Sequence, residues 1–175
     1  IPPPTHPLDI FASVCKNIKW DVSMIINRDF YLNKLISARQ NNMVKVITGI
    51  RRCGKSFLLF NLFKEYLSQN GIDESHFIEI QFDDFAFRKY RNAEEAYNFV
   101  KSKLIDSKQY YIFLDEVQLL ENFEDVLNGF LHIPNADVYV TGSNAKFLSK
   151  DIITEFRGRG YEIHISPLSF SEFMS

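Results

Sequence analysis

Hydrophobic and polar positions follow two different periods along the chain. Short apolar runs rich in β-branched and aromatic residues are typical of strands, and five of them occur, over residues 43–49, 76–82, 110–116, 137–143 and 161–166. Elsewhere apolar residues recur at helical spacing, which predicts helices over residues 28–42, 56–71, 93–107, 121–133 and 144–150. The alternation of strands with helices predicts an α/β fold, a three-layer αβα sandwich around a five-stranded, mainly parallel sheet.

The two ends of the chain differ in character from its middle. Four of the six prolines fall within the first seven residues, so residues 1–23 are expected to be an extension or an added arm with a polyproline-like start. Residues 24–175 are expected to form one domain, in keeping with the total length of 175 residues. A last helix begins within the final ten residues and is cut off, so we expect the natural protein to continue.

Composition narrows the classes of protein to which the chain can belong. The formal net charge of −2 argues against a strongly basic nucleic-acid module. It is compatible with a local basic patch, so the sequence does not decide whether nucleic acid is a partner. No apolar run approaches the roughly 18 residues of a membrane span, so no membrane partner is expected. Two cysteines, Cys15 and Cys53, cannot form a disulfide framework, which favours a cytoplasmic setting. The four histidines lack metal-ligand spacing, so no zinc site is predicted.

One segment carries a phosphate-binding pattern. Residues 49–56 match G-x-x-x-x-G-K-[ST] between a predicted strand and a predicted helix, which is the arrangement of a P-loop. In this pattern glycines let backbone N–H groups wrap a phosphate, Lys55 reaches the β and γ oxygens, and the Ser56 hydroxyl coordinates Mg²⁺. The predicted nucleotide-binding residues are Gly49, Ile50, Arg51, Arg52, Cys53, Gly54, Lys55, Ser56 and Phe57. The alternatives are an accidental glycine-rich turn and, for the two arginines, charge that faces solvent.

Two acidic residues end the uniformly apolar third strand. Such a strand is buried on both faces, so Asp115 and Glu116 have a use only at its carboxyl tip, the edge where open α/β sheets bind ligands. Asp115 is the predicted Mg²⁺ partner, and Glu116 is the predicted base or water-positioning residue for attack on the γ-phosphate. A rival pair, Asp83 and Asp84, follows a strand whose alternation indicates half exposure, and we prefer Asp115 and Glu116.

Further candidates end the fourth strand and precede the fifth. Ser143 and Asn144 are placed to hydrogen-bond the attacking water or the γ-phosphate, or one of them caps the following helix, and both roles can coexist. Arg157 and Arg159 lie among glycines, and an arginine supplied to the γ-phosphate of a neighbouring subunit would stabilise transition-state charge. Solvated surface and contact with an acidic partner are the alternatives for this arginine pair.

Four ordered blocks of sequence point to a family. These blocks, VKVITGIRRCGKS, IFLDEVQ, YVTGSNAKFL and GRGYEIHISPLSFSEF, together resemble the prokaryotic AAA+ ATPases that carry an uncharacterised C-terminal domain, often described as nuclease-like. The resemblance covers about residues 24–175 and implies the AAA+ sandwich, with five parallel strands and the P-loop strand central. ATP and Mg²⁺ are the ligands that it implies. The family's helical lid and C-terminal domain would follow Ser175.

The resemblance also assigns roles to particular residues. Gly49, Gly54, Lys55 and Ser56 match the phosphate-binding motif, Asp115 and Glu116 the metal and catalytic acids, and Ser143 and Asn144 the sensor block. Arg159 is the implied arginine finger, with Arg157 second, and either would join the chain into a homo-oligomer. Arg28 and Tyr31 match the place where such proteins pack their N-terminal helix near the base.

The expected function is Mg²⁺-dependent hydrolysis of ATP to ADP and phosphate, with Glu116, Lys55, Arg159, Ser143 and Asn144 as catalytic residues. The alternatives are an ATP-dependent conformational switch without turnover and a P-loop small-molecule kinase. An acid pair on the strand beside the P-loop suits activation of water, which favours hydrolysis over the kinase. A DNA-associated motor or defence factor gains no support from the charge of this chain. The sequence does not decide between ATP and GTP. No Asn-Lys-x-Asp run, the motif that reads guanine, is evident.

Overall fold

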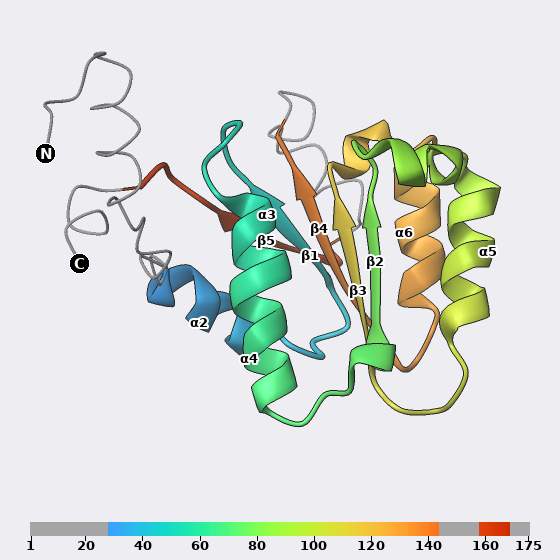
Figure 1. Ribbon diagram of the computed structural model, residues 1–175, viewed down its shortest axis with the longest axis horizontal. Coiled ribbons are helices and arrows are strands. Elements are labelled where there is room, and N and C mark those ends of the chain that lie inside the picture. Colours follow the sequence, from blue (N-terminus) through green and yellow to red (C-terminus); the bar gives the residue numbers. More distant parts are fainter. Residues whose placement is uncertain (1–27, 144–157, 169–175) are drawn as a thin grey trace, which may run out of the picture.

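A computed structural model describes residues 28–143 and 158–168 of the chain. Its strands are β1 (Val44–Thr48), β2 (Phe77–Gln81), β3 (Tyr110–Asp115), β4 (Ala136–Gly142) and β5 (Gly160–His164). They form one sheet in the order β2-β3-β4-β1-β5, and every neighbouring pair is parallel (Figure 1). All carboxyl ends of the strands therefore meet at one edge of the sheet.

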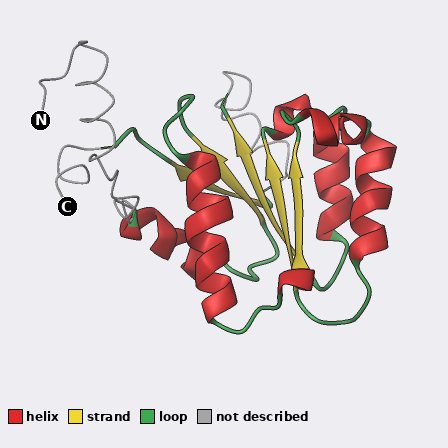
Figure 2. Cartoon of the chain, in the orientation of Figure 1, coloured by secondary structure: helices red, strands yellow, loops and turns green. Residues whose placement is uncertain are grey.

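Helices cover both faces of this sheet. One face carries α2 (Asp29–Ser37) and a longer helix made of α3 (Lys55–Phe57), the π-helical segment η1 (Leu58–Phe63) and α4 (Lys64–Gln69). The other face carries α5 (Ala93–Lys103) and α6 (Phe123–Leu131). Three short 3₁₀ segments complete the described elements, η2 (Glu74–His76), η3 (Phe85–Arg91) and η4 (Val117–Leu119). Figure 2 shows the resulting helix–sheet–helix sandwich, so the expected αβα fold is confirmed.

Burial follows the two sides of the strands. Every residue of β1 and β3 is buried, because helices pack on both of their faces, whereas β2 alternates as expected for an edge strand. Val46, Ile112 and Val140 pack into the core beneath α5 and α6. Ile47 and Phe113 point the opposite way, into the core beneath α2 and the longer helix over residues 55–69, which is called the P-loop helix from here on. This alternation of side chains fixes which residues at the strand ends face the P-loop helix.

Two expectations about strand order are wrong. β1 is not the central strand, because β4 occupies the middle of the sheet and β1 lies second from the edge. For the same reason β3, which ends in Asp115, does not lie beside β1, since β4 is inserted between them. The inserted strand brings its own carboxyl end between the P-loop and the acidic pair, and that end supplies polar contacts to both acids.

Several expectations fall on residues outside the described ranges. These are the extension over residues 1–23, the short helix over residues 144–150, and the roles given to Asn144 and Arg157. Within the ranges that are described, no helix has the length and apolar character needed to cross a membrane.

Candidate functional site

The turn between β1 and α3 has a backbone path that requires its glycines. Gly49 has a φ of 151°, and a Cβ added there would lie 2.4 Å from the carbonyl oxygen of Ile165 and 2.8 Å from Sγ of Cys53. Gly54 has a φ of 90° and begins the helix with a left-handed residue, a conformation that glycine adopts without steric cost. The loop thus curls over the tip of β1 and delivers the amino end of the P-loop helix to the carboxyl edge of the sheet.

Lys55 lies inside this curl. Its side chain is buried, and Nζ donates to the carbonyl oxygens of Gly49 at 3.2 Å and Ile50 at 3.1 Å. In the described part of the chain no carboxylate forms an ion pair with this amine. A buried cation that has only carbonyl acceptors is prepared to bind an anion, because an anion would supply the missing opposite charge.

Ser56, Asp115 and Thr141 form a compact polar cluster at the carboxyl ends of β3 and β4. The Ser56 hydroxyl donates to both carboxylate oxygens of Asp115, at 2.9 Å and 2.8 Å, and the Thr141 hydroxyl donates to Oδ1 of Asp115. The side chains of Asp115 and Thr141 face the P-loop helix, which carries Ser56, since they continue the faces of Phe113 and Tyr139. The polar cluster therefore links the P-loop helix to two strands of the sheet.

The carboxyl of Asp115 is held in an environment that disfavours its charge. Burial raises its pKa above the usual value, and the nearby charges of Glu116 and Asp83 raise it further, while hydrogen bonds from Thr141 and Ser56 act in the opposite direction. A cation at this position would reverse the balance, because it would offset both the desolvation and the repulsion between carboxylates.

Glu116 follows Asp115 in a strained, left-handed conformation, with a φ of 52°. Its backbone N–H donates to the Thr141 hydroxyl at 3.0 Å, so the same threonine contacts both acidic residues. Its carboxylate oxygen Oε2 accepts from Ser143 Oγ at 2.9 Å and from Nε2 of Gln118. Ser143 is therefore in contact with the predicted base, through a hydrogen bond across the ends of β3 and β4.

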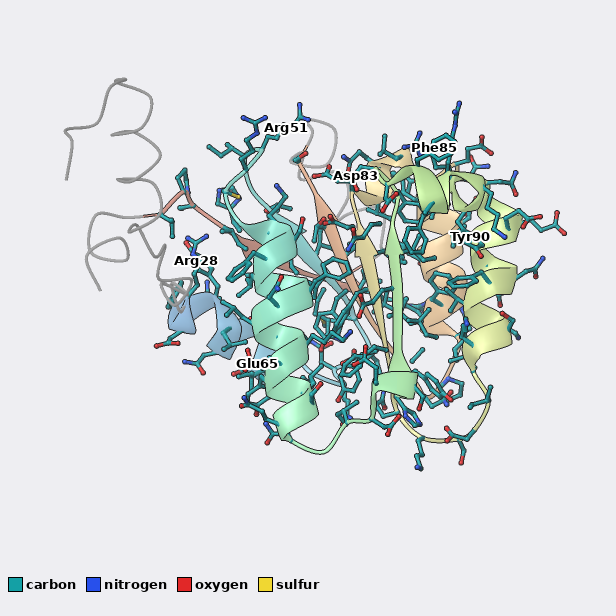
Figure 3. All side chains as sticks on the ribbon, viewed as in Figure 1. Arg28, Arg51, Glu65, Asp83, Phe85 and Tyr90 are labelled. Carbon is teal, nitrogen blue, oxygen red and sulfur yellow. The ribbon has the colours of Figure 1, made fainter. Side chains whose placement is uncertain are left out.

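The rival acids Asp83 and Asp84 have different surroundings. Asp84 caps η3, because its carboxylate accepts from the backbone N–H of Ala86 at 2.9 Å. Asp83 is exposed at the same edge of the sheet as the P-loop residue Arg51 (Figure 3), and its charge reaches Asp115. Only Asp115 is hydrogen-bonded to the P-loop serine, so the geometry favours it over the rival pair.

Arg28 and Tyr31 join the beginning of α2 to the P-loop. The buried guanidinium of Arg28 donates to the carbonyl oxygens of Cys53 and Ser166, both at 2.7 Å, and lies 4.5 Å from the centre of the Tyr31 ring. The Tyr31 hydroxyl accepts from the backbone N–H of Ser166 at 3.2 Å. Beside these contacts lies a cavity of about 530 Å³, which is lined by Arg28, Arg52, Cys53, Gly54, Phe57, Pro167 and Leu168.

The remaining predicted residues have exposed side chains near the loop, lie beneath it, or lie at the opposite edge of the sheet. The side chains of Ile50, Arg51 and Arg52 in the loop and of Phe57 in α3 are exposed, whereas Cys53 is buried beneath Gly49. Arg159 is exposed at the amino end of β5, where its carbonyl accepts from the N–H of Val44. The P-loop follows the opposite end of β1, roughly 15 Å away at 3.3 Å per residue. The structure therefore does not bring Arg159 to the P-loop of its own chain.

Two residues of the site were not among the predicted site residues, Thr141 and Gln118. A signal for each was present in the sequence, because Thr141 interrupts an apolar strand and Gln118 follows the acidic pair by two positions. The contacts themselves depend on β4 lying next to β3 and on the reversal of the chain at Glu116, which periodicity does not reveal.

The oxygen-rich cluster fits a small divalent cation bound together with phosphate. Ser56 uses its hydrogen toward Asp115, so the lone pairs of its Oγ stay available to a metal, and hydroxyl and carboxylate oxygens are the ligands that Mg²⁺ prefers. Within the described residues, no group of three or more histidine, cysteine or acidic side chains can hold a metal. Mg²⁺ characteristically takes one or two protein ligands plus phosphate oxygens and water, which matches this limited set.

Comparison with known proteins finds relatives with clear sequence identity to this chain. An uncharacterized protein of Haemophilus influenzae is 36% identical over 151 residues, which are 86% of this chain and 38% of that protein. An uncharacterized protein of Methanocaldococcus jannaschii is 33% identical over 150 residues, which are 86% of this chain and 31% of that protein. The chain thus spans only about a third of the length of each of these relatives. The expected nuclease-like C-terminal domain finds no support in these matches.

Solved structures share the fold at low sequence identity. A DNA polymerase III gamma subunit-related protein of Thermotoga maritima has a TM-score of 0.56 and 12% identity, covering 80% of this chain and 46% of that chain. A chain of Drosophila ORC bound to DNA has a TM-score of 0.52 and 13% identity, covering 83% and 94%. These neighbours have the AAA+ P-loop fold. The model of the AAA domain family matches residues 41–174, so the chain belongs to this family of ATPase-type nucleotide-binding domains.

Proposed function

We propose that the chain binds ATP with Mg²⁺ and hydrolyses it to ADP and phosphate. The observation that supports this most strongly is the convergence of three groups at one edge of the sheet: the buried amine of Lys55, the Ser56–Asp115 pair and the carboxylate of Glu116. They come from α3 and from the carboxyl end of β3, and together they offer a cation for phosphate, oxygens for a metal and a base for water.

The triphosphate would lie along the P-loop. Backbone N–H groups at the amino end of the P-loop helix attract anions, and Lys55 would exchange its two carbonyl partners for β and γ oxygens. The adenine base would enter the cavity of about 530 Å³ beside Cys53 and Gly54, where Phe57, Pro167 and Leu168 form an apolar lining. Arg28 and Tyr31 would support this cavity from α2 and would not act on the phosphates.

Ser56 and Asp115 would hold Mg²⁺ next to the β and γ oxygens. When bound, the metal supplies neutralisation of the charge that develops on the phosphates. Asp115 would orient the Ser56 hydroxyl by accepting its hydrogen, as it already does, and Thr141 would keep the Asp115 carboxylate fixed against the sheet.

Glu116 would act as the general base. Its Oε2 is occupied by Ser143 and Gln118, while no described residue donates to Oε1, which is therefore available to accept a proton from the attacking water. The bond from the γ-phosphorus to the bridging oxygen breaks as the water oxygen attaches. The proton passes to Oε1 and leaves with the phosphate product.

Arg159, with Arg157 as the second candidate, would complete the site of a neighbouring subunit. Its exposed position at the amino edge of the sheet, a full strand length from the P-loop of its own chain, supports action in trans in a homo-oligomer. A cytoplasmic setting belongs to the same proposal.

The test is Mg²⁺-dependent phosphate release by the intact protein and by Glu116→Gln. We expect the variant to bind ATP within about threefold of the parent and to release phosphate at least about 100-fold more slowly, because a positioned base contributes roughly that factor. Glu95→Gln, an exposed glutamate on α5, is the matched control and should retain the parent rate. A parent that binds ATP without Mg²⁺-dependent phosphate release would favour a conformational switch. ADP formation that requires a second substrate would favour a kinase.

A further inference from the structure

Gln118 makes a contact that neither packing nor secondary structure requires. Its Nε2 donates to Oε2 of Glu116, and its Oε1 is buried without a hydrogen-bond partner, the one such side-chain atom found in the described residues. Buried amides normally satisfy both of their ends. A glutamine that leaves one end unsatisfied in order to reach a carboxylate indicates that the contact with Glu116 is the reason for its position.

The orientation of the Gln118 amide follows from electrostatics. If the amide were reversed, Oε1 would face the Glu116 carboxylate, and two oxygen acceptors would meet without a hydrogen between them. The N–H end must therefore face Glu116, although this leaves the carbonyl end without a partner. The charge of Glu116 thus fixes the glutamine, and the glutamine in turn restrains Glu116.

The backbone holds Gln118 rigidly enough to restrain another side chain. The left-handed conformation of Glu116 turns the chain back on itself, and η4 begins directly after it, with the N–H of Leu119 donating to the Glu116 carbonyl at 3.0 Å. Val117 and Leu120, on either side, are buried in the core beneath α5 and α6. Gln118 is therefore carried on a turn that is anchored before and after it.

Both side-chain donors to Glu116 act on the same oxygen. Ser143 approaches from the end of β4 and Gln118 from η4, and both donate to Oε2. Oε1 receives no hydrogen bond from a described residue, so the carboxylate is fixed at one oxygen and open at the other. A base restrained in this way has one basic oxygen in a defined direction, which is what proton abstraction from a positioned water requires.

We propose that Gln118 is a positioning residue that, together with Ser143, fixes the Glu116 carboxylate for catalysis. This inference rests on the proposed ATP hydrolysis and adds to it a residue that touches neither nucleotide nor water. Gln118 sets the direction of Oε1 of Glu116, and the affinity for nucleotide does not depend on Gln118.

The experiment is a double-mutant cycle on the intact protein with Gln118→Met, which keeps the length of the side chain and removes the donor. We expect kcat for ATP hydrolysis to fall about 10- to 100-fold, with KM and ATP affinity within about twofold of the parent. In the Glu116→Gln background, where the carboxylate is absent, Gln118→Met should change the residual single-turnover rate by less than about twofold.

Gln109→Met is the matched control, because Gln109 is also half-buried and donates through Nε2, but to the carbonyls of Tyr110 and Asn135 at the opposite edge of the sheet. It should leave kcat unchanged. A kcat for Gln118→Met that equals or exceeds the parent value would overturn the proposal, and so would an equal loss in both backgrounds, since that would indicate a general structural role. If the parent itself releases no phosphate while binding ATP, the proposed hydrolysis fails and this inference fails with it.

Discussion

Asp115 shows that side chains at this site are arranged to bind a ligand, at a cost to the stability of the unliganded protein. Its carboxylate is buried, its pKa is raised by that burial, and it lies near two further acids. Its hydrogen bonds from Ser56 and Thr141 offset part of this cost. A carboxylate in such surroundings is expected to destabilise the unliganded protein and to stabilise the complex with a cation.

We therefore predict opposite effects of Asp115→Asn with and without ligand. Without Mg²⁺ and nucleotide, the variant should melt about 2 °C above the parent, since removal of a buried charge contributes on the order of 1 kcal/mol to the free energy of unfolding. With Mg²⁺ and ADP, the parent should gain more stability than the variant. Thermal melts with and without Mg²⁺ and ADP measure both effects. A variant that melts below the parent without ligand would contradict this account of Asp115.

At the scale of elements, the P-loop is held in place by contacts with the segment that follows β5. The N–H of Ile165 donates to the Thr48 carbonyl at 2.8 Å, and its own carbonyl lies against Gly49, where a Cβ would be 2.4 Å away. Arg28 adds a second connection, from Cys53 to Ser166. The shape of the loop thus depends on β5 and on α2 as well as on its own sequence.

Gly49→Ala tests this dependence. We predict a loss of about 2–3 kcal/mol in the free energy of unfolding and a lower affinity for ATP, because the added methyl group would displace Ile165 or Cys53. Gly71→Ala is the matched control: Gly71 also has a positive φ, 86°, but nothing lies within 4 Å of an added Cβ there. It should lose about 1 kcal/mol, from backbone conformation alone. Equal losses in urea denaturation of the two variants would contradict the packing argument.

The elements themselves were largely predictable from the sequence, whereas their order was not. The uniform burial of β3 and the alternation of β2 follow from their apolar patterns, and both agree with the structure. The insertion of β4 between β1 and β3 could not be read from periodicity, because the connections are long enough for other orders. Thr141 was missed for this reason, since its contacts with both acids exist only when β4 and β3 are neighbours.

The site was predictable where a local motif defines it. Lys55 and Ser56 lie where the P-loop pattern places them, and Asp115 meets Ser56 across the sheet. Gln118 could not be assigned, because its role depends on the left-handed turn at Glu116, a conformation uncommon for glutamate. Strain of this kind reflects tertiary contacts and leaves no periodic signal in the sequence.

At the scale of the whole molecule, the two edges of the sheet carry different parts of the proposed mechanism. The carboxyl edge carries the P-loop and both acids, and the amino edge carries Arg159. One chain therefore cannot use its own Arg159 at its own P-loop, and the proposed arginine finger requires a second subunit.

Mixing experiments on the intact protein test this requirement. Arg159→Ala and Lys55→Ala should each have little ATPase activity alone, whereas an equal mixture should recover activity at about a quarter of the sites if subunits assemble at random. Arg88→Ala, at an exposed arginine of η3, should remain active without mixing. Full activity of Arg159→Ala alone would remove this residue from the mechanism.

The central claim is that the curl around Lys55 binds the phosphates of a nucleotide, and calorimetric titration with Mg²⁺ and ATP tests it most directly. The account predicts that the parent and Lys108→Ala, a variant at an exposed lysine, bind with equal affinity, and that Lys55→Ala loses at least about 100-fold. Lys55→Ala that folds normally and binds ATP as tightly as the parent would contradict the account.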